Sequence, residues 1–560
     1  MQVFAQHRSE QEAVQIAQEF FASKKARHPS KLVAVSLPEV RASRNRNLAK
    51  AQQANGQDCG YYIVNDEANC CFVIVSADER MHTVLGYSDN GQFNQESIPE
   101  GLMEMLAEYN CQYSLLLANN EQHVQQPVKN TNAPIPYMIR SKWGQDNPYN
   151  DQCPKDDNGQ QCITGCVATA MAQVMNYHQW PSQGSGIVSY EPIPYIFEVI
   201  SQSLDFNNLT IDWNNIADTY DASTPQIQKD EVAKLMHACG VSVYMDYGPE
   251  DSGADDPNIA YALINNFRYN PNIYYAAKKY YNVEEWNGLI QDELLAGRPI
   301  IYGGGGAGGH QFVLDGMDAD GLYHFNFGWE GSHDGYYALD AISPGLIDYT
   351  TEQAMTIGVC KTETGIHRDV FYTDEFKLDT IINVGGKSKI LYLKPYCFSN
   401  EANTYVGKAR FKGEYGVGVF DKDFNYVKTL YRYTSNKFTA RSVQTSFSGD
   451  GNYITFDNTL FTEGTQYYIA PYAKGEKTEK PTLMRTLNGY EDWYRASVID
   501  GKVILERKKT IDKWYVNAVN DEHFANTPDG SWFNMKGIRI NGKPIGKGIY
   551  LHNGRKVIIK

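Results

Sequence analysis

The chain is 560 residues long, with 42% hydrophobic and 21% charged residues, a globular composition in a chain too long for a single core. Its net charge is −15, and no block of its 51 Lys and Arg residues forms a basic face, so binding to nucleic acid is not expected. The sequence has no apolar run of about 18 residues, which argues against a membrane span. Its ten cysteines form no CxxC pairs and have no His partners at zinc-finger distances, so a structural metal site is not expected.

Residues 1–128 are predicted to form a small α+β domain. Apolar residues at helical spacing predict helices over residues 10–24 and 99–117. Short β-prone runs bounded by turn residues predict strands between them, at residues 61–64, 71–76 and 84–87. Residues 121–136 are polar and Pro-containing and have no periodicity, so they are expected to be a linker.

Helical and strand patterns are mixed from residue 129 to residue 362, which predicts an α+β domain. Helical patterns nearly vanish after this point, and short alternating runs predict a β-sandwich over residues 363–482. Residues 483–560 are expected to form a small β-rich domain, with a hairpin turn at Asn553-Gly554.

The segment TGCVATAMAQVMNYH, residues 164–178, predicts a helix that begins at or beside Cys166, with Thr164 as its N-cap. Unpaired N–H groups and the positive dipole end at a helix N-terminus favour thiolate over thiol. Cys166 is therefore a candidate nucleophile. The alternative is a buried structural cysteine, which is the commoner setting for this residue type.

A glycine run over residues 303–309 leads into His310 at the start of an apolar strand, and glycines allow a substrate chain to approach closely. A phosphate-binding loop is disfavoured, because the run lacks a Gly-Lys-Ser/Thr ending and leads into a strand. His310 follows Cys166 by 144 positions, a spacing typical of papain-type enzymes. On the return strand, Asn326 is a candidate to orient the imidazole and Trp329 to shield that bond from water. Alternatively, they are a strand-end residue and a core aromatic.

Five ordered blocks between residues 137 and 360 resemble the streptopain family, which are bacterial papain-fold cysteine proteases made as zymogens. The blocks are SKWGQDNPYN (141–150), TGCVATAMAQVMNYH (164–178), MDYGPEDSGA (245–254), GGHQFVLDG (308–316) and YHFNFGW (323–329). Residues 1–128 also resemble the inhibitory pro-segment of this family, notably in CFVIVSADER (71–80) and VLGYSDNG (84–91).

The resemblance implies that Cys166 and His310 are the catalytic pair of a papain-like domain and that the side-chain amide of Gln145 helps to bind the oxyanion. Residues that match substrate-contacting positions are Ser252, Gly253 and Gly309. The implied activity is that of an endopeptidase that needs no cofactor or metal and favours a hydrophobic residue two positions before the scissile bond. Phe327 and Gln311 depart from the family pattern, which leaves specificity open.

The expected partners are protein or peptide substrates and the chain's own pro-segment, acting as an intramolecular inhibitor. The C-terminal stretch, residues 538–560, resembles sorting signals of some Gram-negative secreted proteins, although a terminal hairpin explains it equally well. The first residues lack a basic region and an apolar region, so either a signal peptide has been removed or the protein is not exported. The expected location is outside a bacterium or on its surface. Rival functions are transglutaminase-like acyl transfer and adhesion through the β-rich C-terminal half.

Overall fold

A computed structural model describes, in the first part of the chain, residues 7–24, 31–35, 59–119, 133–191, 201–304, 309–341 and 353–362. Further along it describes residues 372–373, 378–392, 397–399, 411–423, 425–438, 443–445, 453–476, 478, 481–486, 493–508, 532–534, 539–540, 548–552 and 555–559. Most of the predicted linker, residues 305–308 of the glycine run and the turn at 553–554 lie outside the described residues. The chain divides into two compact units, one of residues 1–269 and 299–361 and the other of residues 270–298 and 362–560.

One antiparallel sheet organises the first unit, with its strands in the spatial order β1-β2-β3-β4-β11-β10-β9-β8-β12. The strand bounds are β1 Leu32–Val35, β2 Tyr61–Asp66, β3 Cys71–Ser76, β4 Val84–Ser88, β8 Ile300–Gly304, β9 His310–Met317, β10 Tyr323–Asn326, β11 Gly335–Tyr337 and β12 Gln353–Ile357. The predicted strands of segment 1–128 are confirmed, and β1 was not predicted. These strands continue directly into those of the later part of the unit.

The junction of β4 with β11 joins segment 1–128 to the rest of the sheet. Tyr336 pairs with Tyr87 and Tyr337 with Gly86. The approach is close enough to require glycine, because a Cβ at Gly86 would lie 2.3 Å from the ring of Tyr337. The Ser88 hydroxyl also donates to the carbonyl of Asp334 at 2.6 Å. Segment 1–128 is therefore built into the same sheet as β9 and β10.

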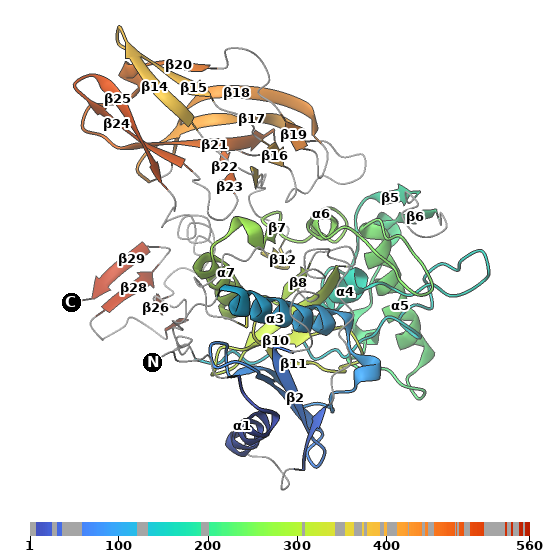
Figure 1. Cartoon of the computed structure of the whole chain (residues 1–560). Coiled ribbons are helices and arrows are strands. Elements are labelled where there is room, and N and C mark those ends of the chain that lie inside the picture. Colours follow the sequence, from blue (N-terminus) through green and yellow to red (C-terminus); the bar gives the residue numbers. More distant parts are fainter. Residues whose placement is uncertain are drawn as a thin grey trace, which may run out of the picture. The chain divides into compact units, whose positions relative to one another are not determined.

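Two helices from segment 1–128 pack on this sheet. The first, α1 (Glu10–Ser23), begins with a capping box between Ser9 and Glu12 and buries its apolar face against β1, β2 and β3. The second, α3 (Glu100–Asn119), lies against β8 and β9 (Figure 1). Its Tyr109 hydroxyl lies 2.5 Å from the carbonyl oxygen of Ala338, which anchors the helix beside β11.

Helix α4 (Cys166–His178) is the central helix of the first unit, and most of its residues are buried. It packs against α5 (Gln226–Ser242) and, from the sheet, against β8 and β9. Smaller elements complete the unit: α6 (Pro257–Asn265), the hairpin β5 (Ile187–Tyr190) and β6 (Gln202–Asp205), and the short helices η1 (Gln95–Ser97), η2 (Phe206–Asn208) and η3 (Trp213–Asn215). Among the described residues, no helix combines the length and apolar character needed to cross a bilayer.

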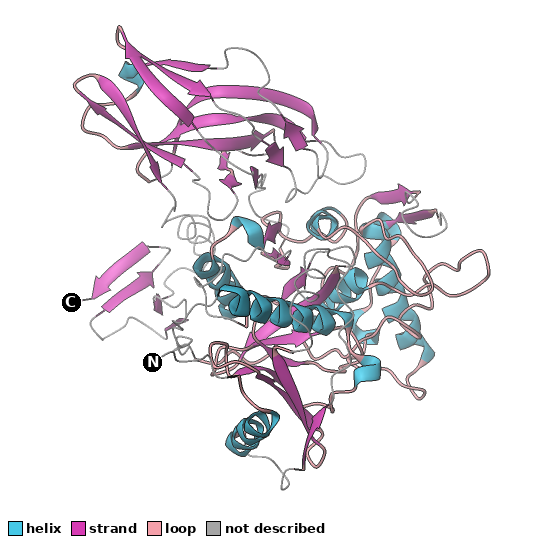
Figure 2. Cartoon of the chain, viewed as in Figure 1, coloured by secondary structure: helices cyan, strands magenta, loops and turns pink. Residues whose placement is uncertain are grey.

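The second unit is mostly strand after residue 372 (Figure 2). Its sheets follow the orders β18-β17-β21-β24-β25 with β22 beside β21, β14-β15-β20, β19-β16-β13-β23 and β27-β26-β28-β29. The elements are β7 Tyr274–Ala277, η4 Lys278–Tyr280, α7 Val283–Leu295, β13 Tyr372–Thr373, β14 Leu378–Val384, β15 Lys387–Tyr392, β16 Cys397–Ser399, β17 Phe411–Phe420, β18 Tyr426–Phe438, β19 Val443–Thr445, β20 Tyr453–Asp457, η5 Asn458–Leu460, β21 Tyr467–Gly475, β22 Thr482–Leu483, β23 Arg485–Thr486, β24 Trp493–Ile499, β25 Lys502–Lys508, β26 Trp532–Asn534, β27 Arg539–Ile540, β28 Gly548–His552 and β29 Arg555–Ile559.

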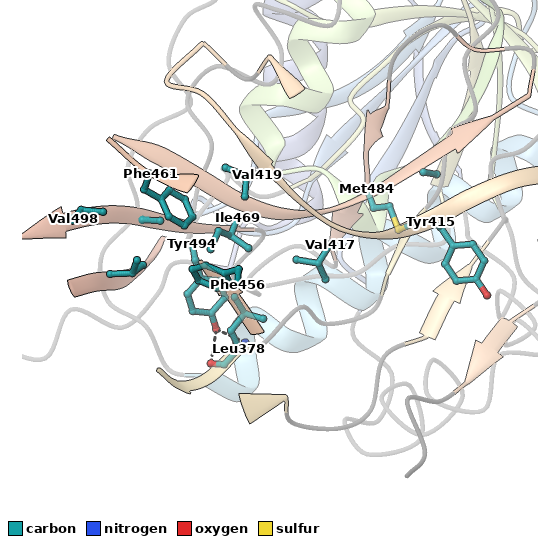
Figure 3. Close-up of a cluster of buried hydrophobic side chains, with 13 residues drawn as sticks. Leu378, Tyr415, Val417, Val419, Phe456, Phe461, Ile469, Met484, Tyr494 and Val498 are labelled. Carbon is teal, nitrogen blue, oxygen red and sulfur yellow. Dashed lines mark hydrogen bonds between the residues drawn. The ribbon is translucent and has the colours of Figure 1, made fainter. Parts of the chain in front are cut away.

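An apolar core holds β14, β17, β20, β21 and β24 together, and Figure 3 shows its side chains. The Tyr494 hydroxyl is engaged within it, accepting from the backbone N–H of Leu378 at 2.8 Å. The expected fold class, an α+β protein followed by an all-β part, is confirmed. The domain limits 1–128, 129–362, 363–482 and 483–560 stay predictions.

Candidate active site

The predicted nucleophile, Cys166, is the first residue of α4. The N-cap is Gly165, with φ 82°, so the prediction of Thr164 as the cap was wrong by one residue. A side chain does not fit there, because a Cβ would lie 2.7 Å from the Ser252 carbonyl oxygen and 2.8 Å from Met245 Cε. No side chain caps this helix end, so its N–H groups and positive dipole end are left to act on the Cys166 sulfur.

The predicted base, His310, is the first residue of β9, the strand that packs against α4. The Cys166 side chain is among the groups that raise the pKa of its imidazole, which places the two side chains within reach of each other. The next backbone N–H, that of Gln311, donates to Cys166 Sγ at 3.4 Å. The structure therefore brings Cys166 and His310 together. A thiol beside an imidazole at a helix N-terminus is the setting in which cysteine becomes a nucleophile near neutral pH.

The second ring nitrogen of His310 faces segment 1–128. Its Nδ1 lies 2.8 Å from Oε2 of Glu100, the first residue of α3. Burial lowers the pKa of His310, but hydrogen bonds to Cys166 and Glu100 outweigh it and raise the pKa to about 11. The same bond holds the pKa of Glu100 below its ordinary value. The contact of Glu100 with His310 was not predicted, since a glutamate in the first turn of a helix is an ordinary helix-start residue.

The predicted orienter, Asn326, is not brought to His310. Its Oδ1 accepts from Gln173 Nε2 and from the backbone N–H of Gly328, each at 3.0 Å, and its Nδ2 donates to the carbonyl of Ser141 at 2.8 Å. This buried amide ties the end of β10 to α4 and to the chain before Gln145. Trp329 is half-buried in the turn that follows, and the bond that it was expected to shield is not formed.

The predicted oxyanion residue, Gln145, lies beside the start of α4, because its carbonyl accepts the N–H of Thr164 at 3.1 Å. The side-chain amide of Gln145 makes no hydrogen bond within the described part of the chain and is half-buried. The preceding Trp143 is fully buried and donates from Nε1 to the carbonyl of Ala217 at 3.0 Å. Gln145 thus combines a fixed backbone with an uncommitted amide, as an oxyanion donor requires.

The predicted substrate-contacting residues differ in exposure. Ser252 is buried, and its hydroxyl donates to the carbonyl of Ile163 at 2.9 Å, which fixes the loop before Gly165. Gly253 is exposed and has no heavy atom within 4 Å of its Cβ position, while its backbone pairs with Asp246. Gly309, next to His310, is also exposed. The two glycines are therefore exposed and carry no side chain that would cover the predicted pair.

A buried histidine to which no role was assigned, His324, lies on β10. His324 on β10 pairs through Nδ1 with Asp315 Oδ1 at 2.6 Å and stacks on Tyr137. The other carboxylate oxygen accepts the backbone N–H groups of Met138 and Ile139. This pair serves to fix residues 137–139 against the sheet. Within the described ranges, no group of three His, Cys, Asp or Glu side chains could hold a metal ion.

Comparisons with known proteins separate a pro-segment from a protease domain, as the sequence motifs do. The model of the peptidase C10 family matches residues 143–337. The model of the Spi protease inhibitor matches residues 5–113, which contain α1, the strands β1 to β4 and most of α3. The residues of α4, β9 and β10 fall within the first match and Glu100 within the second.

Individual relatives come from bacteria. Streptopain of Streptococcus pyogenes is 35% identical over 298 residues, which cover 49% of this chain and 73% of streptopain. The thiol protease/hemagglutinin PrtT of Porphyromonas gingivalis is 26% identical over 371 residues, covering 62% of this chain and 41% of PrtT. A solved structure of a fragment of prointerpain A from Prevotella intermedia matches 55% of this chain and 97% of that fragment, with 33% identity and a TM-score of 0.49.

Proposed function

The chain belongs to the peptidase C10 family of streptopain and is a cysteine endopeptidase with a Spi-like pro-segment, and from this premise we propose that Cys166 is its nucleophile and His310 its general acid and base. The observation that carries the proposal is the 3.4 Å hydrogen bond from the Gln311 N–H, next to His310, to Cys166 Sγ, which holds the start of β9 against the start of α4.

The reaction follows from the positions of these groups. The Cys166 sulfur attacks the peptide carbonyl, and the oxyanion that forms accepts hydrogen bonds from the Cys166 backbone N–H and the Gln145 amide. His310 protonates the amine as it leaves and then activates the water that cleaves the thioester. The Gln173–Asn326 pair acts on the scaffold, since it ties β10 to α4.

Modification of the mature enzyme with iodoacetamide is expected to label Cys166 before the other cysteines and to abolish casein cleavage in parallel. Cys162 and Cys239 are buried, and burial raises the pKa of both thiols, that of Cys162 to about 11, so they react slowly. Peptide mapping by mass spectrometry identifies the labelled residue. Loss of activity with Cys166 unmodified would contradict the proposal, and incorporation of a labelled amine into casein in place of cleavage would favour acyl transfer.

We propose further that the enzyme acts outside the bacterial cell on protein substrates and favours a hydrophobic residue two positions before the scissile bond. Support comes from the family membership and the bacterial relatives. The exposed Gly253, with no heavy atom within 4 Å of its Cβ position, leaves room for the substrate chain on the acyl side of Cys166. Adhesion through the second unit is the remaining alternative for residues 366–560.

The pro-segment is proposed to restrain the enzyme by occupying the His310 imidazole. Glu100 Oε2 lies 2.8 Å from His310 Nδ1. A carboxylate at this nitrogen stabilises the protonated imidazole, which cannot serve as a base. Release of α3 would therefore remove a carboxylate that raises the pKa of His310, so that the imidazole can both give and take protons in the reaction.

The Glu100→Gln variant of the full chain is expected to convert to the active form about threefold to tenfold faster than the wild type at pH 6.5, because an exposed charged contact is lost. The Glu100 side chain is 44% exposed, so the ion pair with His310 is expected to stabilise the inactive form only modestly. The folded pKa of Glu100 is lowered, so its contact is present above its ordinary pKa of 4.5 and is lost as pH falls through the lower value. Acidification should therefore speed conversion of the wild type more than that of Glu100→Gln.

The matched control is Glu10→Gln, which removes an exposed first-turn glutamate from α1. Conversion is followed by the appearance of the processed chain on gels and by peptide hydrolysis. Equal rates for Glu100→Gln and Glu10→Gln at every pH would contradict a role for the ion pair.

A further inference from the structure

We propose that Glu330 is a specificity-determining residue that selects a basic side chain on the leaving-group side of the scissile bond. The inference rests on the proposed function, because it needs a substrate chain that lies across Cys166. Its basis is a carboxylate that lies beside the proposed oxyanion residue and makes no hydrogen bond or ion pair within the described fold.

The backbone of Glu330 is fixed against the chain that carries Gln145. The Glu330 N–H donates to the carbonyl of Trp143 at 3.0 Å, and its φ is 53°. Left-handed backbone at a residue other than glycine is uncommon and is kept only where the surroundings determine it. Trp143 is fully buried, so the turn rests on a rigid support.

The side chain of Glu330 folds over Gly144, the residue before Gln145. A Cβ built on Gly144 would lie 2.9 Å from Glu330 Cγ and 3.6 Å from its Cδ, so the absence of a side chain at 144 leaves the space that Glu330 occupies. Glu330 is therefore packed directly beside the segment that offers the oxyanion donor.

This turn lies on the leaving-group side of the site. It follows β10, which pairs with β9, the strand that starts at His310. Gly328 in the same turn meets the first turn of α4, because a Cβ there would lie 3.0 Å from Thr169 Cγ2. The acyl side is flanked instead by Ser252, whose carbonyl meets Gly165. Since His310 protonates the departing amine, the new N-terminal part of the substrate passes by residues 329 and 330.

The charge of Glu330 is available to a substrate. The residue is exposed, and no ion pair or hydrogen bond to its carboxylate occurs among the described residues. Lys142 packs across Gly331 in the same turn without pairing with Glu330. A free carboxylate next to the path of the leaving group attracts Lys or Arg and repels Asp or Glu.

The test uses enzyme matured from the full chain and fluorogenic peptides that are identical up to the scissile bond and carry Lys, Gln or Glu at the second position after it. Each exposed charge contact changes kcat/KM by roughly twofold to fivefold, so the wild type should prefer the Lys peptide over the Glu peptide by about tenfold at low salt. Glu330→Gln should bring the two peptides within about twofold, and Glu330→Lys should reverse the preference. The preference should shrink at about 0.5 M salt because exposed charges are screened.

The control is Asp230→Asn, which removes one negative charge from an exposed position of α5. It should keep the wild-type preference. A wild-type enzyme that cleaves the three peptides equally, or a preference that survives in Glu330→Gln or is lost equally in Asp230→Asn, would overturn the inference. Failure to cleave any of the peptides or casein would instead refute the proposed function, so the two failures are distinguishable.

Discussion

Replacement of Cys166 by alanine is expected to lower kcat/KM for casein or a peptide by at least about 10,000-fold, because no other group can form the covalent intermediate. Every step of the proposed reaction passes through this sulfur. Cys153, Cys162 and Cys239 cannot substitute, since they are buried. Hydrolysis measured under reducing conditions, after the pro-segment has been removed by an added protease, checks the result.

His310→Ala is expected to reduce kcat/KM nearly as much, and the double variant should be no worse than Cys166→Ala alone. Residues that act as one unit have effects that do not add, because loss of either removes the same attack step. Additive losses would show that the two side chains act separately. Thermal unfolding serves as the folding control, since a half-buried sulfur at the start of α4 contributes little to the core. Activity retained by Cys166→Ala would end the assignment of the nucleophile.

The parts of the site that could be predicted from the sequence are those whose structure is determined by residues close together in the chain. The helix of residues 164–178 and the apolar strand that starts at His310 each show their own periodicity, so their structures follow from local rules. The N-cap prediction was wrong because a residue far away in the chain decides which residue type fits there. Thr164 is the residue type favoured at an N-cap, but the contact with the Ser252 carbonyl admits only glycine at the position that caps the helix.

Contacts between distant segments were not predictable from one sequence. Glu100 and His310 meet because β4 pairs with β11 and α3 lies against β9, and neither pairing leaves a local pattern. Asn326 was expected to orient His310 on the basis of its position alone. Its amide instead completes a buried network with Gln173 and Ser141, in which an unpaired polar atom would be costly.

In the second unit, the alternation of apolar residues predicted the strands but not their order. The runs at 416–420 and 467–473 fall in β17 and β21, which are neighbours in one sheet. Val417, Val419, Ile469 and Ala473 are buried in one apolar cluster, and Phe420, Ala470 and Tyr472 in a second, so these strands are covered on both faces, whereas a period of two predicts one buried face. Sheet order depends on pairings between strands far apart in the chain, such as that of β15 with β20.

Replacement of Gln145 is expected to have the second large effect on activity, because its side-chain amide is proposed to stabilise the negative charge that develops on the oxyanion. Its backbone is fixed by the bond from Thr164, and the buried Trp143 holds the segment before it. A fixed donor aimed at the oxyanion acts only when the carbonyl becomes tetrahedral, so its removal should affect the chemical step and not the binding of substrate.

Gln145→Ala is therefore expected to lower kcat by about 100- to 1,000-fold with a small change in KM. Alkylation of Cys166 by iodoacetamide forms no oxyanion, so its rate should stay within about twofold of the wild type if the thiol and His310 are undisturbed. The matched control is Gln152→Ala, an exposed glutamine of the same loop whose amide donates to the carbonyl of Asp230. It should keep the activity of the wild type. A Gln145→Ala enzyme that loses alkylation and hydrolysis together would show that Gln145 supports the structure of the thiol site, and one that keeps full kcat would remove Gln145 from the oxyanion site.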